Sequence, residues 1–200
     1  MSHPKIARTD HDVHELIRQR WSPRAFDAGR AVPRADWLRL FEAARWAPSS
    51  RNEQPWRFLV LDRATASDQW RALFDTLTAK NRAWAESAPL LVLAAVRMEY
   101  EDLGVTNRMA WYDAGQAVGF LSLQATAQGL SVRQMEGFDR DAARRACDVP
   151  AEFDLAVVIA IGYLGDPGAL TVESHRESER QPRRRKPIGE FVYEGRWGRV

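Results

Sequence analysis

The feature that most constrains this chain is the uninterrupted apolar run Pro89–Val96, with the sequence PLLVLAAV. A strand that is covered on both faces has a continuous apolar sequence, whereas a strand with one face in water alternates. The run is also far too short to cross a bilayer as a helix. We therefore expect the central strand of a sheet with helices on both faces, and no membrane partner.

Helical and strand patterns alternate along the rest of the chain. Apolar spacings of three and four, bounded by proline or glycine, predict helices, and short apolar runs predict strands. Gly129 stands where a glycine commonly ends a helix. The alternation predicts an α/β or α+β fold with a covered sheet. The expected helices are 13–20, 33–47, 67–80, 106–128 and 140–147, and the expected strands are 56–61, 89–96 and 155–161, with a short extended stretch before residue 135.

The composition is that of a folded chain with balanced charge. Its 29 Lys and Arg residues against 27 Asp and Glu give a net charge of +2, and 45% of the residues are hydrophobic. These values exclude intrinsic disorder and argue against a basic nucleic-acid-binding protein. No repeat and no Gly/Ser-rich linker divides the 200 residues, so we expect one domain over 1–200.

The cysteine and histidine residues and the N-terminal segment further restrict which kinds of protein this chain can be. The single cysteine, Cys147, excludes an internal disulfide and a cysteine-based zinc cluster. His11 and His14 are spaced for one helix face, but no carboxylate or cysteine pattern completes a site, so we expect surface histidines and no metal. The polar start MSHPKIARTDHD lacks the apolar core of a signal peptide, which predicts a cytoplasmic protein.

The C-terminal segment 170–200 is expected to be an extended tail. Ser174–Lys186 is too highly charged to form a core, yet four large apolar residues follow it: Phe191, Val192, Tyr193 and Trp197. Apolar side chains beyond a charged stretch favour a strap that packs on another surface, most simply a second subunit. The alternative is a frayed terminus.

Two basic clusters stand near opposite ends of the chain. RQRWSPRAF holds Arg20, Ser22 and Arg24, and RRRKP holds Arg183 and Arg185. Guanidinium groups gathered with a hydroxyl suit a phosphate dianion, which accepts several charge-assisted hydrogen bonds. Each cluster by itself also fits a solvated surface, and residues 183–186 also fit a nucleic-acid-binding arm.

Two further segments are uncharged loops or turns. In WAPSSRNEQPWRF, Pro48 and Pro55 stiffen a loop of neutral donors and acceptors: Ser49, Ser50, Asn52 and Gln54. Such a loop suits the polar edge of a flat heterocycle, and equally an ordinary turn. MEGF, residues 135–138, contains Gly137, where the backbone either approaches a ligand closely or simply turns.

Taken together, the four segments resemble the FMN-dependent nitroreductase family over nearly the whole chain. The most diagnostic run is APSSRNEQPW, residues 47–56, and a basic-Ser-x-basic-x-Phe pattern that starts at Arg20 precedes it. Gln-Gly-Leu at 128–130, MEGF, Ile-Gly-Tyr at 161–163 and Arg-Lys-Pro at 185–187 follow in the family's order. The resemblance implies an α+β fold with a central mixed sheet covered by helices, and a homodimer in which the extension 170–200 wraps the partner subunit.

The resemblance also implies an FMN site at the subunit interface. One subunit would hold the phosphate, the ribityl chain and the pyrimidine edge through Arg20, Trp21, Ser22 and Arg24, with Arg183 and Arg185 completing the phosphate clamp. The partner subunit would add a loop against the isoalloxazine: Pro48, Ser49, Ser50 and Asn52.

The remaining implied contacts lie around the flavin ring. Glu136 and Gly137 would offer backbone N–H groups beside flavin N5, and Asn81 matches a family asparagine at the ring, with a register ambiguous by one residue. Trp21 and Pro23 depart from the family pattern, so at Trp21 a backbone contact is expected rather than a side-chain contact.

The implied activity is that of an FMN-dependent oxidoreductase, which transfers hydride in a ping-pong reaction from NADH or NADPH through flavin N5 to a nitroaromatic, a quinone or a related electrophilic acceptor. Because the cofactor carries the chemistry, we expect no catalytic side chain. Reduction places negative charge at N1 and the C2 carbonyl, and Arg24 is our candidate for a fixed cation there. The alternatives are flavin reduction or reductive dehalogenation on the same fold, and, outside enzymes, nucleic-acid binding through residues 183–186, against which the balanced charge argues.

Overall fold

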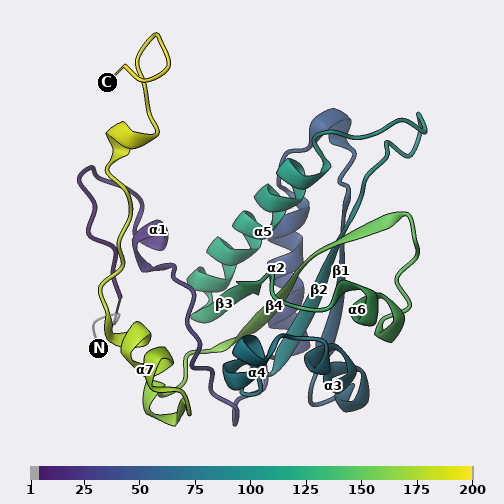
Figure 1. Ribbon diagram of the computed structural model, residues 1–200, viewed down its shortest axis with the longest axis vertical. Coiled ribbons are helices and arrows are strands. Elements are labelled where there is room, and N and C mark those ends of the chain that lie inside the picture. The colour runs from purple at the N-terminus through teal and green to yellow at the C-terminus, as the bar shows by residue number, and fades with distance from the viewer. Residues whose placement is uncertain (1–4, 200) are drawn as a thin grey trace.

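The computed structural model describes residues 5–199, which form a four-stranded sheet with helices on both faces (Figure 1). The strands lie in the order β1 (Trp56–Asp62), β2 (Leu90–Arg97), β4 (Phe153–Tyr163) and β3 (Leu130–Met135). All three pairings are antiparallel. Residues 1–4 of the polar N-terminal segment and Val200 of the expected C-terminal extension lie outside the described residues.

The prediction of a mixed sheet is wrong for these strands. β2 and β3 run in the same direction, as strands joined by a helical crossover do, but β4 lies between them and runs the opposite way. A crossover produces a parallel pair only where its two strands are neighbours. The position of β4 therefore makes the described sheet antiparallel throughout.

β2 is central, as its apolar sequence predicts. Every residue from Leu90 to Val96 is buried, because β1 and β4 pair with its edges and helices cover its faces. On one face the helices are α3 (Ser67–Asp75), α4 (Ala79–Ala85) and α6 (Arg140–Ala146), and on the other they are α2 (Arg34–Arg45) and α5 (Ala110–Ala127). Two dry faces are the condition under which a strand needs no polar residue.

The helix expected over 67–80 is instead two helices, α3 and α4, with a break at residues 76–78. Thr76 Oγ1 donates to the carbonyl oxygen of Leu73 at 2.7 Å, and Leu77 pairs with Phe138 in an isolated β-bridge. The N–H of Thr78 donates to the carbonyl oxygen of Gly137 at 3.0 Å. Tertiary partners thus replace helical ones at the break, which places the start of α4 against the MEGF turn.

Helix α5 begins at Ala110, later than the predicted position 106. Thr106 pairs with Glu99 in a β-bridge, and Asn107 Oδ1 accepts the N–H of Met109, so these residues leave the helix. After the last helical residue, Gly129 has a φ of +71°, which confirms its predicted role at the helix end. Three large apolar residues of α5 remain exposed: Trp111, Tyr112 and Phe120.

The prediction of an extended tail over 170–200 is wrong in its first part. Glu173–Arg180 forms helix α7, which buries His175 and Glu179 although the stretch is highly charged. Short 3₁₀ turns, Pro167–Ala169 and Ile188–Glu190, lie on either side of it. Beyond residue 188 the chain extends away from the sheet (Figure 1), and the side chain of Trp197 is 92% exposed.

Candidate functional site

The N-terminal basic segment runs along the open edge of the sheet, beside β3. Helix α1 (Glu15–Gln19) ends before Arg20, as predicted, and Phe26 then forms a β-bridge with Leu164. Arg133 on β3 donates from Nη1 to the carbonyl oxygen of Ser22 at 2.5 Å. Residues 20–26 are therefore tied to the sheet at both ends of the segment.

Three guanidinium groups from the two ends of the chain gather at this edge: Arg20, Arg183 and Arg185. Arg183 donates from Nη1 to the carbonyl oxygen of Arg20, and Arg20 donates from Nη1 to Ser22 Oγ at 3.1 Å. Burial lowers the pKa of Arg20 and of Arg183, and the neighbouring guanidinium groups lower it further. Guanidinium groups that repel one another in a partly buried position are stabilised by an anion between them.

The three groups have no carboxylate counterion in the part of the chain that the structure describes. No carboxylate within residues 5–199 forms an ion pair with any of them. The Nε atom of Arg183 is buried without a hydrogen-bond partner in that part of the chain. A buried donor without an acceptor costs about 1–3 kcal/mol, so the cluster is built for an acceptor that comes from outside the chain.

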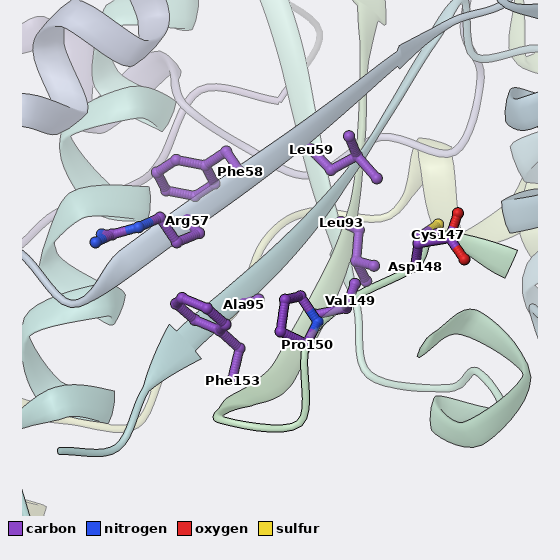
Figure 2. A pocket seen from close by; sticks show the side chains of 10 residues that line it. All are labelled: Arg57, Phe58, Leu59, Leu93, Ala95, Cys147, Asp148, Val149, Pro150 and Phe153. Atoms are coloured by element: carbon purple, nitrogen blue, oxygen red, sulfur yellow. The ribbon is translucent and has the colours of Figure 1, made fainter. Parts of the chain in front are cut away.

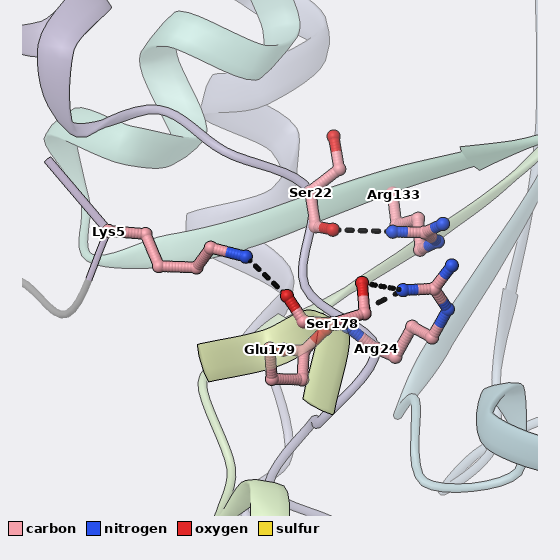
Figure 3. A network of polar contacts seen from close by, with 6 residues as sticks. All are labelled: Lys5, Ser22, Arg24, Arg133, Ser178 and Glu179. Atoms are coloured by element: carbon pink, nitrogen blue, oxygen red, sulfur yellow. Dashed lines mark hydrogen bonds and ion pairs between the residues drawn. The ribbon is translucent and has the colours of Figure 1, made fainter. Parts of the chain in front are cut away.

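A second charged group surrounds Glu179 of α7, beside Arg24 (Figure 3). The backbone N–H of Arg24 donates to Glu179 Oε1 at 3.1 Å, and its guanidinium Nη1 lies 3.9 Å from the same oxygen. Lys5 Nζ donates to the carbonyl oxygen of Ser178 at 2.6 Å, and Arg24 Nη1 donates to Ser178 Oγ at 3.0 Å. Burial raises the pKa of Glu179, while the N–H of Arg24 and the charges of Lys5, Arg24 and Arg133 lower it. Three cations thus share one buried carboxylate.

The MEGF turn follows β3 and is held by the break between α3 and α4. Asn81 Nδ2 donates to the carbonyl oxygen of Gly137 at 2.9 Å, next to the N–H of Thr78. A Cβ atom at Gly137 would lie 3.0 Å from both Asn81 Nδ2 and Thr78 Oγ1, so only glycine fits without displacement. Glu136 is exposed and forms an ion pair with Arg140 at 3.5 Å. Asn81, Glu136 and Gly137 therefore lie close together in the structure.

The loop that contains Pro48, Ser49, Ser50 and Asn52 has a strained backbone. Three of its residues have positive φ, namely Arg51 at 55°, Asn52 at 58° and Gln54 at 50°. Such a conformation costs a non-glycine residue about 1–3 kcal/mol and persists only where the surroundings enforce it.

Hydrogen bonds enforce that conformation. The N–H of Ser50 donates to Asp113 Oδ2 at 2.9 Å, and the Ser50 hydroxyl pairs with the Tyr100 hydroxyl at 2.9 Å. The N–H of Gln54 donates to Ser49 Oγ at 3.0 Å. Asp113 is 2% exposed and lies in the first turn of α5. The loop is thereby anchored to α5, while Asn52 at its tip stays exposed.

Within one chain, the predicted site residues form two separate groups. Arg20 lines a hollow of about 190 Å³ together with Thr126 and Gly129, at the C-terminal end of α5, and a second hollow of about 470 Å³ with Gln116, Phe120 and Gln134, beside the middle of that helix. Ser50 instead bonds to Asp113, near the N-terminal end of the same helix. At 1.5 Å per residue, Asp113 and Thr126 are separated by about 20 Å along the helix axis. No hydrogen bond, ion pair or shared hollow within residues 5–199 joins the loop 48–52 to Arg20, Ser22 or Arg24.

Trp21 keeps its side chain inside the protein. The ring is 8% exposed, and the Lys5 ammonium lies 4.7 Å from the ring centroid. This burial fits the expectation of a backbone contact rather than a side-chain contact at this position.

Arg133 and Asp113 contact predicted site residues although neither belongs to a motif. An acidic residue in an otherwise apolar helix is a signal that Asp113 has a buried partner, but the sequence does not say which one. Arg133 carries a weaker signal. It stands two residues before the buried Met135 on β3, and therefore faces the same side of the sheet.

A different hollow, of about 270 Å³, lies against edge strand β1 (Figure 2) and contains none of the predicted site residues. Its walls are mostly apolar and include Leu59, Leu93, Phe153 and Cys147. Burial, with a smaller effect of Asp148, raises the pKa of the Cys147 thiol, which disfavours the nucleophilic thiolate. Cys147 is therefore a packing residue.

Two kinds of feature are not found in the described part of the chain. No three His, Cys, Asp or Glu side chains between residues 5 and 199 are placed to hold a metal ion. Over the same range, no helix combines the length and the apolar character that a membrane span needs.

Comparison with known proteins identifies the family. The model of the nitroreductase family matches residues 17–163. The chain belongs to the nitroreductase family. The chain is 33% identical over 135 residues to an uncharacterized 15.4 kDa protein of Mycolicibacterium smegmatis, across 68% of this chain and 89% of that protein. It is 29% identical over 178 residues to an NADH dehydrogenase of Thermus thermophilus, across 72% of this chain and 82% of that enzyme.

Solved structures agree with this assignment. The crystal structure of an oxidoreductase containing FMN matches the nitroreductase with a TM-score of 0.89 and 30% identity, over 97% of each chain. The α+β nitroreductase fold predicted from the motifs is therefore confirmed, and the protein is an oxidoreductase of the NAD(P)H nitroreductase family.

Proposed function

We propose that this nitroreductase binds FMN along the β3 edge and transfers hydride in a ping-pong reaction from NADH or NADPH to a nitroaromatic, a quinone or a related electrophilic acceptor. The observation that carries the proposal is the cluster of Arg20, Arg183 and Arg185, which has no carboxylate counterion within residues 5–199. A terminal phosphate dianion supplies the charge and the several acceptors that this cluster lacks.

The residues present fit FMN along the whole edge. Arg20 of the guanidinium cluster shares hollows with residues 130, 131 and 134 of β3, Arg24 lies near Arg133 of the same strand, and the Gly137 turn follows the end of the strand. Six strand residues span about 20 Å, enough for an extended flavin mononucleotide. Bound FMN would supply the hydride chemistry itself, while the protein supplies binding, orientation and charge.

Each group then has a distinct task in our proposal. The guanidinium cluster binds the phosphate, and Ser22 adds its hydroxyl. Asn81 and Thr78 fix the carbonyl of Gly137, so that the turn offers N–H groups of Glu136 and Gly137 in one orientation. Arg24 places a fixed cation where reduction makes the pyrimidine ring negative, which favours hydride acceptance. No side chain has to act as an acid, a base or a nucleophile.

We propose further that the site is completed by a second copy of the chain. A two-fold axis that packs two α5 helices antiparallel brings the C-terminal end of one beside the N-terminal end of the other. Ser49, Ser50 and Asn52 of one subunit would then meet the β3 edge of its partner. The exposed Trp111, Tyr112 and Phe120 of α5 supply apolar surface for such an interface.

The C-terminal extension supports the same assembly. Phe191 is 61% exposed, and Val192 and Trp197 are also exposed, so their burial needs a surface outside the described chain. In this proposal, residues 1–200 form a single FMN-binding domain in the cytoplasm, and its extension 170–200 wraps the partner subunit beyond helix α7.

Cofactor analysis tests the proposal directly. The purified protein is reconstituted with FMN and with FAD, freed of excess flavin, and the bound flavin is released with acid and identified by chromatography. We expect one FMN per chain and reduction of that FMN by NADH or NADPH, with parallel double-reciprocal plots against acceptor. Bound FAD, or no bound flavin, would overturn the proposal. A colourless protein with salt-sensitive DNA binding would favour the nucleic-acid-binding alternative.

A further inference from the structure

Arg133 lies at the centre of the β3 edge, although the sequence marks no motif there. Its guanidinium group donates to the carbonyl oxygen of Ser22 at 2.5 Å and lies 5.2 Å from the ring centroid of Trp84 on α4. Within the described residues this is the one hydrogen bond of the Arg133 side chain. A guanidinium group carries five N–H donors, so most of its donors remain for another partner.

The charge around Arg133 is unbalanced. Figure 3 shows the guanidinium groups of Arg133 and Arg24 near each other, on the same side of Ser22 and Ser178. Burial lowers the pKa of Arg133 to about 10, and the charge of Arg24 contributes to this lowering. Glu179 acts in the opposite direction, but Glu179 is already paired with Arg24 at 3.9 Å. Two guanidinium groups therefore share one carboxylate, and the pair keeps a net positive charge.

The position of this pair decides what it can do. Arg20 of the phosphate cluster shares hollows with residues 130, 131 and 134 of β3, and the Gly137 turn follows the end of that strand. Arg133 lies on the same rigid strand, whereas Arg24 lies on a loop. A cation on a strand needs no reorganisation when charge develops beside it, which is the condition for effective electrostatic stabilisation.

We propose that Arg133 is a second cation of the flavin site, which acts together with Arg24 on the negative charge that reduction places on the flavin pyrimidine ring. This inference rests on the proposed FMN function. It assigns to Arg133 an effect on the reduction equilibrium rather than on the binding of oxidised FMN, because within the described residues Arg133 interacts with Arg24 and Glu179 and not with the phosphate cluster.

A purely structural role makes a different prediction. Arg133 also anchors Ser22 and stacks on Trp84, and loss of either contact would weaken FMN binding and stability without moving the reduction potential. The midpoint potential of bound FMN therefore separates the two roles.

The experiment compares Arg133→Gln, Arg133→Lys and the exposed control Arg145→Gln, each reconstituted with FMN. Midpoint potentials are measured by reductive titration against a redox dye, and FMN dissociation constants by flavin fluorescence. For Arg133→Gln we expect a tenfold loss in the reduction equilibrium constant, which is about 30 mV for a two-electron couple. Its dissociation constant for oxidised FMN should change less than about threefold, and Arg133→Lys and Arg145→Gln should stay near the wild-type potential at neutral pH.

The outcomes are distinguishable. Wild-type protein that binds no FMN overturns the proposed function itself. FMN-loaded Arg133→Gln with an unchanged potential overturns the role of Arg133 and leaves the proposed function intact. An equal fall of potential in the Gln and Lys variants also contradicts a charge effect.

If Arg133→Gln does not fold, the Lys variant carries the test alone. Lysine loses its proton at a pH where arginine keeps it. The potential of Arg133→Lys should therefore fall away from the wild-type value as the pH rises through the lysine pKa. Parallel curves for the two proteins over that range would refute the inference.

Discussion

Two halves of the candidate site lie along helix α5, and they differ in how their polar groups are paired. Beside the middle and the C-terminal part of the helix, Arg20 gathers with Arg183 and Arg185 without a counterion in the described chain. Near the N-terminal end, the loop 48–54 has uncharged residues at its predicted contacts, and its strained backbone is fixed by internal hydrogen bonds to Asp113 and Tyr100.

This contrast shows where each half finds its stability. In the cationic half the guanidinium groups repel one another, and a bound anion relieves this repulsion. The favourable electrostatic interactions of this half therefore form only when the anion binds. In the loop half the hydrogen bonds are already made within the chain, so a ligand adds little to its stability. This half contributes a fixed backbone conformation to the site. Substitutions in the first half should therefore act on affinity, whereas substitutions of the residues that anchor the loop should act on folding stability.

The largest expected effect tests whether the halves come from different subunits. Arg20→Glu and Asn52→Asp should each be inactive as pure proteins. If they are unfolded together and refolded, half of the dimers are mixed, and in each of these one site has both lesions and the other has none. About a quarter of the wild-type activity should return, given random pairing and independent sites. Mixed dimers that are confirmed by mass but have no more activity than the separate variants would rule out the shared site.

The next effect concerns FMN affinity. Arg20→Ala removes a guanidinium group from the cationic half and should weaken FMN binding by about 1.5–3 kcal/mol, roughly 10- to 150-fold. Arg51→Ala, an exposed residue of the loop half, is the matched control and should change affinity far less. Fluorescence titration with FMN measures both. Equal affinities for wild type and Arg20→Ala would remove Arg20 from the phosphate site.

A comparable effect on stability is expected in the loop half. Asp113→Ala leaves the buried N–H of Ser50 without its acceptor and should lower the free energy of unfolding by about 1–3 kcal/mol. Asp113→Asn keeps an acceptor oxygen and should lose less. Urea unfolding of the FMN-free proteins provides the measurement. If Asp113→Ala is as stable as wild type, the loop is not held by this bond.

The smallest effect is a pH dependence that comes from the charged group around Glu179 and Arg24. Burial raises the pKa of Glu179 in the folded state, so the folded protein holds more protons than the unfolded chain just above the ordinary carboxyl pKa. The stability that this group contributes is present below that ordinary pKa and is lost as the pH rises through the raised value. Glu179→Gln should abolish this contribution to the pH dependence of the free energy of unfolding, whereas the control Glu177→Gln, at an exposed position, should retain it. Identical pH profiles for wild type and Glu179→Gln in urea unfolding would contradict the assignment.

The local sequence pattern predicted those helices and strands whose own residues show what environment they need. The run Pro89–Val96 could be stable only with both faces covered, and β2 has that environment. Helix 67–80 was mispredicted because Leu77 and Thr78 have partners about 60 residues away, at Phe138 and Gly137. The tail was mispredicted for a related reason, since the charged helix α7 is stable through the contacts of Glu179 and Ser178 with Arg24.

The sequence by itself determined the covered central strand, the helix ends at Arg20 and Gly129, and the motifs that mark the nitroreductase family, because each depends on neighbouring residues or on their order. Only the tertiary structure decided that β4 separates β2 from β3, that Arg133 lies beside Arg24, and that the two groups of site residues make no contact with each other within the described chain. These are contacts between distant segments, and the side chains that make them carry no local periodicity. Their energies come from burial and charge, which exist only after the chain has folded.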